Sequence, residues 1–142
     1  PRNVGMSIRS AVAGGLDGVL LPRQGTCGIN PLVIKSSAGT VFRSRILHCE
    51  SLAPVLRMAR TDAEGAQVYV LDAKAPESLF DLPPAPRSIF VLGSESRGVG
   101  PKVRAEATAR VHVPMAQDVE SLNVAVAAAL VAYRRLLAGG RA

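Results

Sequence analysis

The sequence predicts an α/β domain built on a mostly parallel sheet that is flanked by helices. Five short apolar runs, rich in β-branched residues, recur along the chain, and Gly, Pro or Asp bounds them, which is typical of buried strands. Helical patterns lie between these runs, and strands that alternate with helices form parallel sheets. We therefore expect the 142 residues to form one domain. The expected strands are residues 17–22, 45–49, 67–72, 88–93 and 109–115.

Four helices are expected, and most carry a start or stop signal. A Gly pair ends the first pattern, Ser51 is a candidate N-cap of the second with Pro54 in its first turn, and Pro101 opens the third. The last begins near Ser121, and its body from Val124 is apolar on every face, which requires cover on both sides. The expected helices are 3–15, 51–65, 101–109 and 121–138, and the Pro-rich stretch 75–88 is expected to be a surface connection.

Composition limits the classes of protein to which the chain can belong. The net charge of +6 suits a polyanionic partner such as RNA, although a basic soluble surface explains it equally well. Only five aromatic residues are present, fewer than binders that stack single-stranded bases use. Cys27 and Cys49 form no zinc or disulfide pattern, so a reducing cytoplasm is the simplest compartment. His48 and His112 alternate with apolar neighbours rather than with metal ligands, and the apolar run 124–133 is too short to span a bilayer.

Familiar phosphate-binding and nucleophile motifs are absent from the Gly-rich stretch "VLGSESRGVG". Gly93 and Gly98 have the separation of a P-loop, but Val99 and Gly100 stand where Lys and Ser or Thr are required. A dinucleotide-binding glycine pattern fails at Val103. The serines do not fit the Gly-x-Ser-x-Gly elbow of hydrolases.

Three polar or Gly-rich stretches nevertheless adjoin expected strands or helices: residues 1–11, 91–100 and 113–125. Parallel sheets bind ligands at the carboxyl ends of their strands. Gly93 follows such a strand and would let a ligand approach the backbone, and Val113-Pro114-Met115 could flank a flat ring. Taken singly, the simpler interpretations are a helix cap for Ser121, a solvated carboxylate for Glu95 and an exposed side chain for Arg9.

Taken together, the three stretches resemble the motifs of the SpoU (TrmH-like) branch of the SPOUT methyltransferase superfamily. In this sequence, "NVGMSIRSAVAGGLDGVLL" resembles the family's first motif. The stretch "IFVLGSESRGVG" resembles its second motif, and "VHVPMAQDVESLNVAVAAAL" resembles its third. The stretch "KSSAGTVF" is similar to a Ser-x-Gly segment that the family carries between motifs one and two. Ser96 and Val99 replace a commoner Gly and Leu. The chain enters motif one within three residues, so we expect that an N-terminal RNA-binding domain is missing.

The resemblance implies a fold, a reaction and a set of site residues. The fold would be an α/β domain with a C-terminal trefoil knot, a rare exception to the rule against threading. The protein would be a homodimer that transfers a methyl group from S-adenosylmethionine to a ribose 2′-OH in structured RNA, without a metal or a membrane. The cofactor contacts would be Leu71, Leu92, Gly93, Val113, Met115, Ser121 and Leu122, and the catalytic residues Asn3, Arg9, Glu95, Ser121 and Asn123.

The chemistry of this reaction is mainly positioning. Methyl transfer from a sulfonium is an in-line displacement, and a ribose hydroxyl needs its proton removed or polarised. Arg9 stands where the family's proposed base stands, but an arginine keeps its proton at neutral pH, so holding an RNA phosphate beside the target ribose is an easier role. Asn3 or Asn123 could orient that arginine, and Glu95 could accept a proton or anchor its loop. The resemblance favours ribosomal RNA over tRNA; a tRNA methyltransferase, a non-catalytic RNA-binding module and a base methyltransferase are the alternatives.

Overall fold

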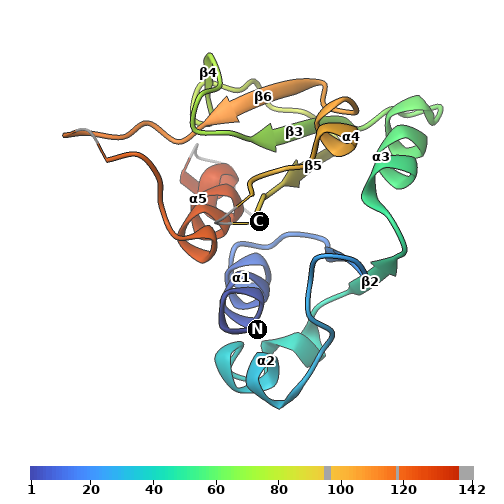
Figure 1. The fold of residues 1–142 in the computed structure, drawn as a ribbon, viewed down its shortest axis with the longest axis vertical. Helices are drawn as coiled ribbons and strands as arrows, with labels where there is room; N and C mark the ends of the chain where they lie inside the picture. The colour runs from blue at the N-terminus through green and yellow to red at the C-terminus, as the bar shows by residue number, and fades with distance from the viewer. Residues whose placement is uncertain (95–96, 118, 138–142) are drawn as a thin grey trace. The chain divides into compact units, whose positions relative to one another are not determined.

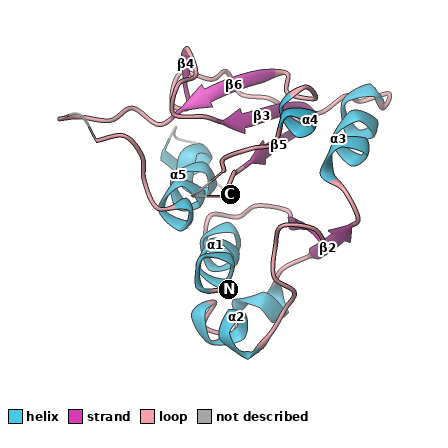
Figure 2. Cartoon of the chain, in the orientation of Figure 1, coloured by secondary structure: helices cyan, strands magenta, loops and turns pink. Residues whose placement is uncertain are grey.

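The computed structural model describes residues 1–94, 97–117 and 119–137 (Figure 1). The chain forms two compact units. The first unit combines both ends of the chain, residues 1–51 and 124–142, and the second unit is the continuous segment 52–123. Figure 2 distinguishes their helices from their strands. The first unit contains α1 (Arg2–Ala13), β1 (Val19–Pro22), α2 (Pro31–Ser36), the 3₁₀ helix η1 (Thr40–Arg43), β2 (Ile46–Cys49) and α5 (Val124–Leu137).

The core of the first unit forms where α1, α2 and η1 pack together. Ile8, Val33 and Val41, one from each helix, are buried against one another. The helices α1 and α2 approach closely at Gly5, because a Cβ there would lie 2.6 Å from the Val33 carbonyl oxygen. The glycine of motif one is therefore a packing residue. Beside this core, β1 and β2 pair in parallel, with Val19 opposite Ile46.

Helix α5 packs against α1 through its small side chains (Figure 1). The closest approach is at Gly14, where a Cβ would lie 2.6 Å from the Ala132 carbonyl oxygen. One face of α5 is thus covered within the unit, while another carries exposed apolar side chains. The buried residues of α5 include Ala125, Ala128, Val131 and Ala132, and the exposed ones include Val126, Tyr133 and Leu137.

The start of α5 corrects the expected start near Ser121. The helix begins at Val124, so Asn123 occupies the position directly before it and Ser121 lies outside the helix. Asn is among the residues preferred at the N-cap, and here it stands next to the apolar run. The interpretation of Ser121 as the cap of this helix is therefore wrong.

The second unit is a parallel four-stranded sheet with helices α3 (Leu52–Thr61) and α4 (Pro101–Arg104). Its strands, β3 (Gln67–Leu71), β4 (Glu77–Ser78), β5 (Ser88–Val91) and β6 (Ala109–His112), are ordered β4-β6-β3-β5 (Figure 1). Leu56 of α3 packs with Val68, Val70 and Val91 in the core of this unit. The prediction of an α/β chain with parallel strands is confirmed at all five expected positions.

Three further regions of the chain differ from the sequence-based expectation. The Pro-rich connection contains the short strand β4, and α2 with η1 occupies a region where no helix was expected. The expected helix 101–109 ends at Arg104. Its remainder turns into the sheet, because the Thr108 N–H donates to the Val68 carbonyl (2.7 Å) and the Thr108 hydroxyl accepts from the Val68 N–H (3.0 Å).

A buried carboxylate joins α3 to the segment that follows α4. The Glu106 side chain is only 7% exposed, and its Oε1 accepts hydrogen bonds from Arg57 Nη2 (2.5 Å) and Nε (3.0 Å). Arg60 donates to the Glu106 carbonyl oxygen at 3.2 Å. The hydrogen bond from Arg57 lowers the pKa of the Glu106 carboxyl, since it stabilises the charged form.

Glu106→Gln is expected to lower the thermal unfolding midpoint near pH 7, because it removes the charge that pairs with Arg57. Since folding lowers the pKa of Glu106, its contribution is complete above the ordinary carboxyl pKa of about 4 and is lost as pH falls through the lowered value. The difference in unfolding midpoint between the unchanged protein and Glu106→Gln should therefore become smaller in melting curves recorded below about pH 4. The control is Glu64→Gln, which breaks an exposed pair with Arg87 and should change little. A gap of equal size at pH 3 and pH 7 would refute this account.

Candidate functional site

The carboxyl ends of three neighbouring strands bring four predicted cofactor residues to one edge of the second unit. The strands β6, β3 and β5 are adjacent and parallel, so their carboxyl ends share that edge. Leu71 ends β3, Leu92 and Gly93 directly follow β5, and Val113 directly follows β6. The side chains of Leu71, Leu92 and Val113 are half-buried. This edge is the place where parallel α/β sheets bind their ligands.

The donor set at this edge suits a nucleoside-containing ligand. Across the described ranges, the backbone N–H and C=O groups of Gly93 and Val113 make no hydrogen bond within the protein. Apolar side chains stand beside these groups, so a flat ring could be both enclosed and hydrogen-bonded there. The residues therefore fit the adenosine part of S-adenosylmethionine, whose recognition needs an apolar slot and backbone donors and acceptors.

Gly93 has a structural role in addition to the expected contact with the cofactor. A Cβ at this position would lie 2.4 Å from the Gly98 carbonyl carbon and 2.7 Å from the Val99 nitrogen. Ser94 and Gly98 exchange two backbone hydrogen bonds (2.8 and 3.1 Å), which close the motif-two loop over Gly93. The chain's own backbone thus approaches Gly93 closely enough to exclude a side chain there. Glu95, between these residues, lies outside the described residues.

The motif-three residues that the structure describes follow β6 outside any helix or strand. Met115 is 37% exposed, Ser121 and Asn123 are exposed, and Leu122 is half-buried. All four belong to the second unit, with Asn123 at its last position. The side chains of Met115 and Ser121 are thus accessible to a ligand.

The motif-one residues lie on α1 in the first unit. Asn3 is half-buried in the first turn of the helix, and Arg9 is exposed two turns later. The Arg9 guanidinium makes no ion pair or hydrogen bond with any side chain in the described part of the chain. A free, exposed guanidinium can form two parallel hydrogen bonds to a phosphate.

Sequence reasoning missed Asp72, which directly follows β3 at the same edge as Leu71. The Asp72 side chain is 15% exposed, and its Oδ2 lies 3.3 Å from Arg104 of α4 and 3.5 Å from Arg110 of β6. Its Oδ1 accepts from the Lys74 N–H at 3.1 Å. Asp72 thereby ties α4 and β6 to the end of β3. An acidic residue one position beyond an apolar strand was the only available signal.

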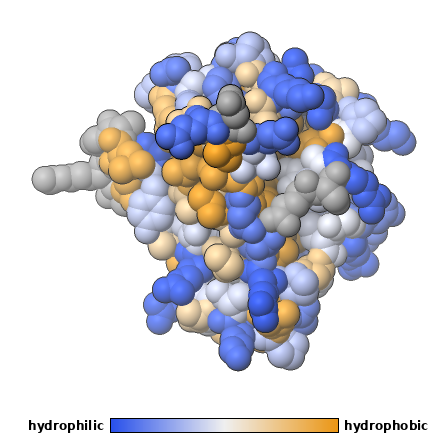
Figure 3. Space-filling model, turned by 60° about the vertical axis from the view of Figure 1, so that its left-hand side comes forward, coloured by the Kyte–Doolittle hydropathy of each residue, from blue (hydrophilic) through white to orange (hydrophobic). Residues whose placement is uncertain are grey.

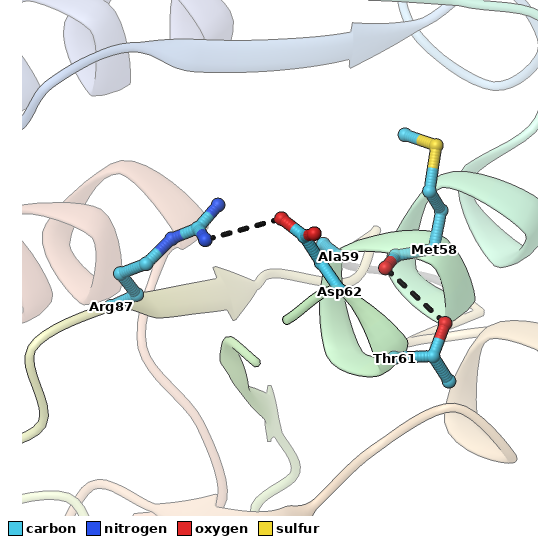
Figure 4. Close-up of a pocket in the computed structure, with 5 residues that line it drawn as sticks. All are labelled: Met58, Ala59, Thr61, Asp62 and Arg87. Atoms are coloured by element: carbon cyan, nitrogen blue, oxygen red, sulfur yellow. Dashed lines mark hydrogen bonds and ion pairs between the residues drawn. The ribbon is translucent and has the colours of Figure 1, made fainter. Parts of the chain in front are cut away.

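A hollow of about 380 Å³ lies elsewhere in the second unit (Figure 4). It is lined by Met58, Ala59, Thr61 and Asp62 of α3 and its end, and by Arg87, directly before β5. Arg87 forms an ion pair with Asp62 at 3.3 Å. Arg87 precedes β5, so the hollow adjoins the amino end of that strand, whereas the predicted cofactor residues adjoin the carboxyl ends. It contains none of the predicted site residues.

The whole chain up to Tyr133 matches one family. Residues 1–133 match the model of the SpoU rRNA Methylase family. The chain belongs to this family. The resemblance seen in the three motifs is thereby confirmed.

Individual relatives agree with this assignment. A 23S rRNA (guanosine-2′-O-)-methyltransferase, RlmB, of Xylella fastidiosa is 34% identical over 133 residues, covering 94% of this chain and 53% of that protein. A putative TrmH-family RNA methyltransferase from Porphyromonas gingivalis has a TM-score of 0.82 at 32% identity, with 93% of this chain and 53% of that chain covered. The SpoU methyltransferase AviRb from Streptomyces viridochromogenes, solved with its cofactor AdoMet, has a TM-score of 0.88 at 27% identity, with 99% and 55% covered. The chain spans about half the length of the curated relatives it matches.

Two further properties concern only the described residues. Within residues 1–94, 97–117 and 119–137, no three His, Cys, Asp or Glu side chains are grouped as metal ligands. None of the helices in these ranges has the length and apolar character needed to cross a membrane.

Proposed function

We propose that this chain is the catalytic domain of an S-adenosylmethionine-dependent methyltransferase that modifies a ribose 2′-OH in structured RNA. The observation that carries the proposal is the shared carboxyl edge of β3, β5 and β6, where motif-two and motif-three residues meet in a chain of the SpoU family. We further propose ribosomal RNA as the substrate. The identity to the 23S rRNA methyltransferase of Xylella fastidiosa supports this choice.

In the proposed mechanism, the residues of this chain bind and orient. Leu71, Leu92 and Val113 would enclose the adenosine moiety, with hydrogen bonds from the backbone beside Gly93. S-adenosylmethionine supplies an electrophilic methyl group when bound. Arg9 would hold an RNA phosphate so that the neighbouring ribose hydroxyl is in line with that methyl group.

The remaining catalytic assignments concern the proton of the 2′-OH group. Asn3, Ser121 and Asn123 carry neutral donors and acceptors that can orient the hydroxyl, and Glu95 can accept its proton. Loss of that proton increases the electron density on the attacking oxygen. We retain these four residues as part of the proposed site.

The proposal extends to assembly, topology and compartment. We propose a homodimer in which a second copy covers the exposed apolar face of α5, with Val126, Tyr133 and Leu137. Apolar side chains (orange) are visible at the surface in Figure 3. Sedimentation velocity should therefore give twice the mass of the chain, and a monomer at micromolar concentration would exclude the dimer. A C-terminal trefoil knot, as in the SPOUT fold, and a reducing cytoplasm, which suits the free thiols of Cys27 and Cys49, complete the proposal.

The experiment that tests the function uses methyl-labelled S-adenosylmethionine. The protein is incubated separately with ribosomal RNA and with tRNA from unmodified transcripts, and the products are digested to nucleosides. Label on a ribose 2′-oxygen of ribosomal RNA is the expected result. Label in tRNA alone would show that tRNA, and not ribosomal RNA, is the substrate. Label on a base would show that the protein is a base methyltransferase. RNA binding without any methyl transfer would identify a non-catalytic RNA-binding module.

A further inference from the structure

The net positive charge of the protein comes from the first unit. Residues 1–51 and 124–142 contain nine Lys or Arg but only two Asp or Glu, whereas residues 52–123 contain eight basic and nine acidic residues. The first unit therefore carries a net charge of +7 and the second a net charge of −1, in agreement with the total of +6. Such a division favours binding of a polyanion by one unit rather than by the chain as a whole.

Ion pairing increases the contrast between the units. In the second unit, Glu106, Asp72 and the pair Asp62 and Glu64 neutralise arginines. The arginines paired in this way are Arg57, Arg60, Arg87, Arg104 and Arg110.

In the first unit, Arg23 pairs with Glu50 at 3.1 Å. Five other basic side chains of this unit are exposed and make no ion pair within the described ranges: Arg2, Arg9, Lys35, Arg43 and Arg45. Their charge is not compensated locally, so it is available to a partner.

Three of these free cations lie on helices that pack against one another. Lys35 is in the last turn of α2, next to Ser36, whose hydroxyl lies against Gly5 of α1. Arg9 is one turn along α1 from Gly5, and Arg43 ends η1, which also packs on α1. Figure 1 shows α1 and α2 side by side. We call Arg9, Lys35 and Arg43 the basic face.

Local backbone geometry holds this face in place. Between α2 and η1 the chain reverses at Ala38 (φ 51°) and Gly39 (φ 75°), and the Ser37 side chain is completely buried. The Ser37 hydroxyl donates to the Ile34 carbonyl at 3.0 Å, and the Thr40 hydroxyl donates to the Ser37 carbonyl at 2.7 Å. Lys35 and Arg43 flank this turn on either side, so their backbone positions are fixed before any ligand binds.

We propose that the basic face binds the phosphate backbone of the RNA substrate and that Lys35 and Arg43 extend the phosphate contact of Arg9 beyond the reacting nucleotide. The inference rests on the proposed function for the identity of the RNA, but not for the binding itself. Phosphate neutralisation releases condensed counterions, so each contact steepens the decrease in affinity with salt concentration. The second unit, in which five of the six arginines are paired internally, contributes little to this term.

The test compares two variants of equal charge change. Lys35→Ala/Arg43→Ala removes two cations of the basic face, and Lys74→Ala/Lys102→Ala removes two exposed cations of the second unit. Binding of a fluorescently labelled ribosomal RNA hairpin is measured by anisotropy over a series of KCl concentrations. We expect the first variant to bind roughly tenfold more weakly at low salt, with a salt slope shallower by about one unit per lost contact. The second variant should bind like the unchanged protein.

Further measurements separate the possible outcomes. Circular dichroism melting verifies folding, and Lys35→Gln/Arg43→Gln, which removes the charges but keeps polar side chains, should repeat the loss. Equal losses in both alanine variants, or no loss in the first, would overturn the inference. Calorimetry with S-adenosylmethionine alone should give the same affinity for all variants. If the unchanged protein binds RNA through the basic face but neither binds S-adenosylmethionine nor transfers a methyl group, the proposed function fails while this inference stands.

Discussion

Arg9→Ala is expected to reduce methyl transfer to RNA by roughly 100-fold or more, while the affinity for S-adenosylmethionine stays unchanged. The Arg9 side chain is exposed and makes no ion pair or side-chain hydrogen bond among the described residues, so its removal should leave the packing of α1 intact. The loss would therefore come from the position of the ribose relative to the methyl group. Single-turnover kinetics at saturating RNA measures this step, and calorimetry measures the cofactor affinity.

The matched control for Arg9→Ala is Arg2→Ala, which removes an exposed arginine from the same helix. It should keep most of the turnover. Arg9→Lys separates charge from geometry, because lysine keeps the charge but cannot form the two-pronged contact with a phosphate. Turnover close to that of the unchanged protein in Arg9→Ala would remove Arg9 from the reaction. Loss of cofactor affinity in that variant would instead place Arg9 at the cofactor.

Gly93→Val is expected to weaken S-adenosylmethionine binding by roughly tenfold or more and to lower stability by about 1–3 kcal/mol, a cost typical of overpacking. The added Cβ would meet the Gly98 carbonyl carbon at 2.4 Å, so the backbone of the motif-two loop must move. Movement of this loop displaces the groups beside Leu92 that would contact the cofactor. Titration calorimetry and thermal melting measure the two effects separately.

The control for Gly93→Val is Gly100→Ala at the other end of the same loop. A Cβ at Gly100 would have no neighbour within 4 Å, and its φ of −65° is accessible to any residue. The substitution should cost at most about 1 kcal/mol through the weaker N-cap of α4 and leave cofactor affinity unchanged. Unchanged affinity in Gly93→Val would show that the loop at Gly93 does not border the cofactor.

The strands were predictable because each is a short apolar run bounded by Gly, Pro or Asp. The order of the three motifs identified the family. Helix α2 had readable signals as well, since the Asn30 side chain caps it (3.0 Å to the Leu32 N–H) and Pro31 opens it. Six residues were too few to show a helical periodicity. An Asn that can act as an N-cap directly before a Pro therefore indicates even a helix as short as α2.

The roles of individual site residues were harder to predict, because they depend on distant partners. The sequence shows that Gly93 and Gly5 are glycines, but their nearest atoms belong to Gly98 and to α2. The Asp72 carboxylate acquires its role only when Arg104 and Arg110 fold over it. Such pairings arise from tertiary structure, which local pattern does not encode.

The construction of the first unit from both ends of the chain has a consequence for synthesis on the ribosome. The second unit is continuous, so it can fold as soon as its last strand has left the exit tunnel. The packing of α1 on α5, in contrast, closes a loop of roughly a hundred residues, and its closure entropy must be overcome before any contact is gained. Until α5 has been synthesised, the nascent polypeptide therefore exposes the surface of α1 that will later receive this helix. Helix α5 thus covers a helix that the ribosome synthesised roughly a hundred residues earlier.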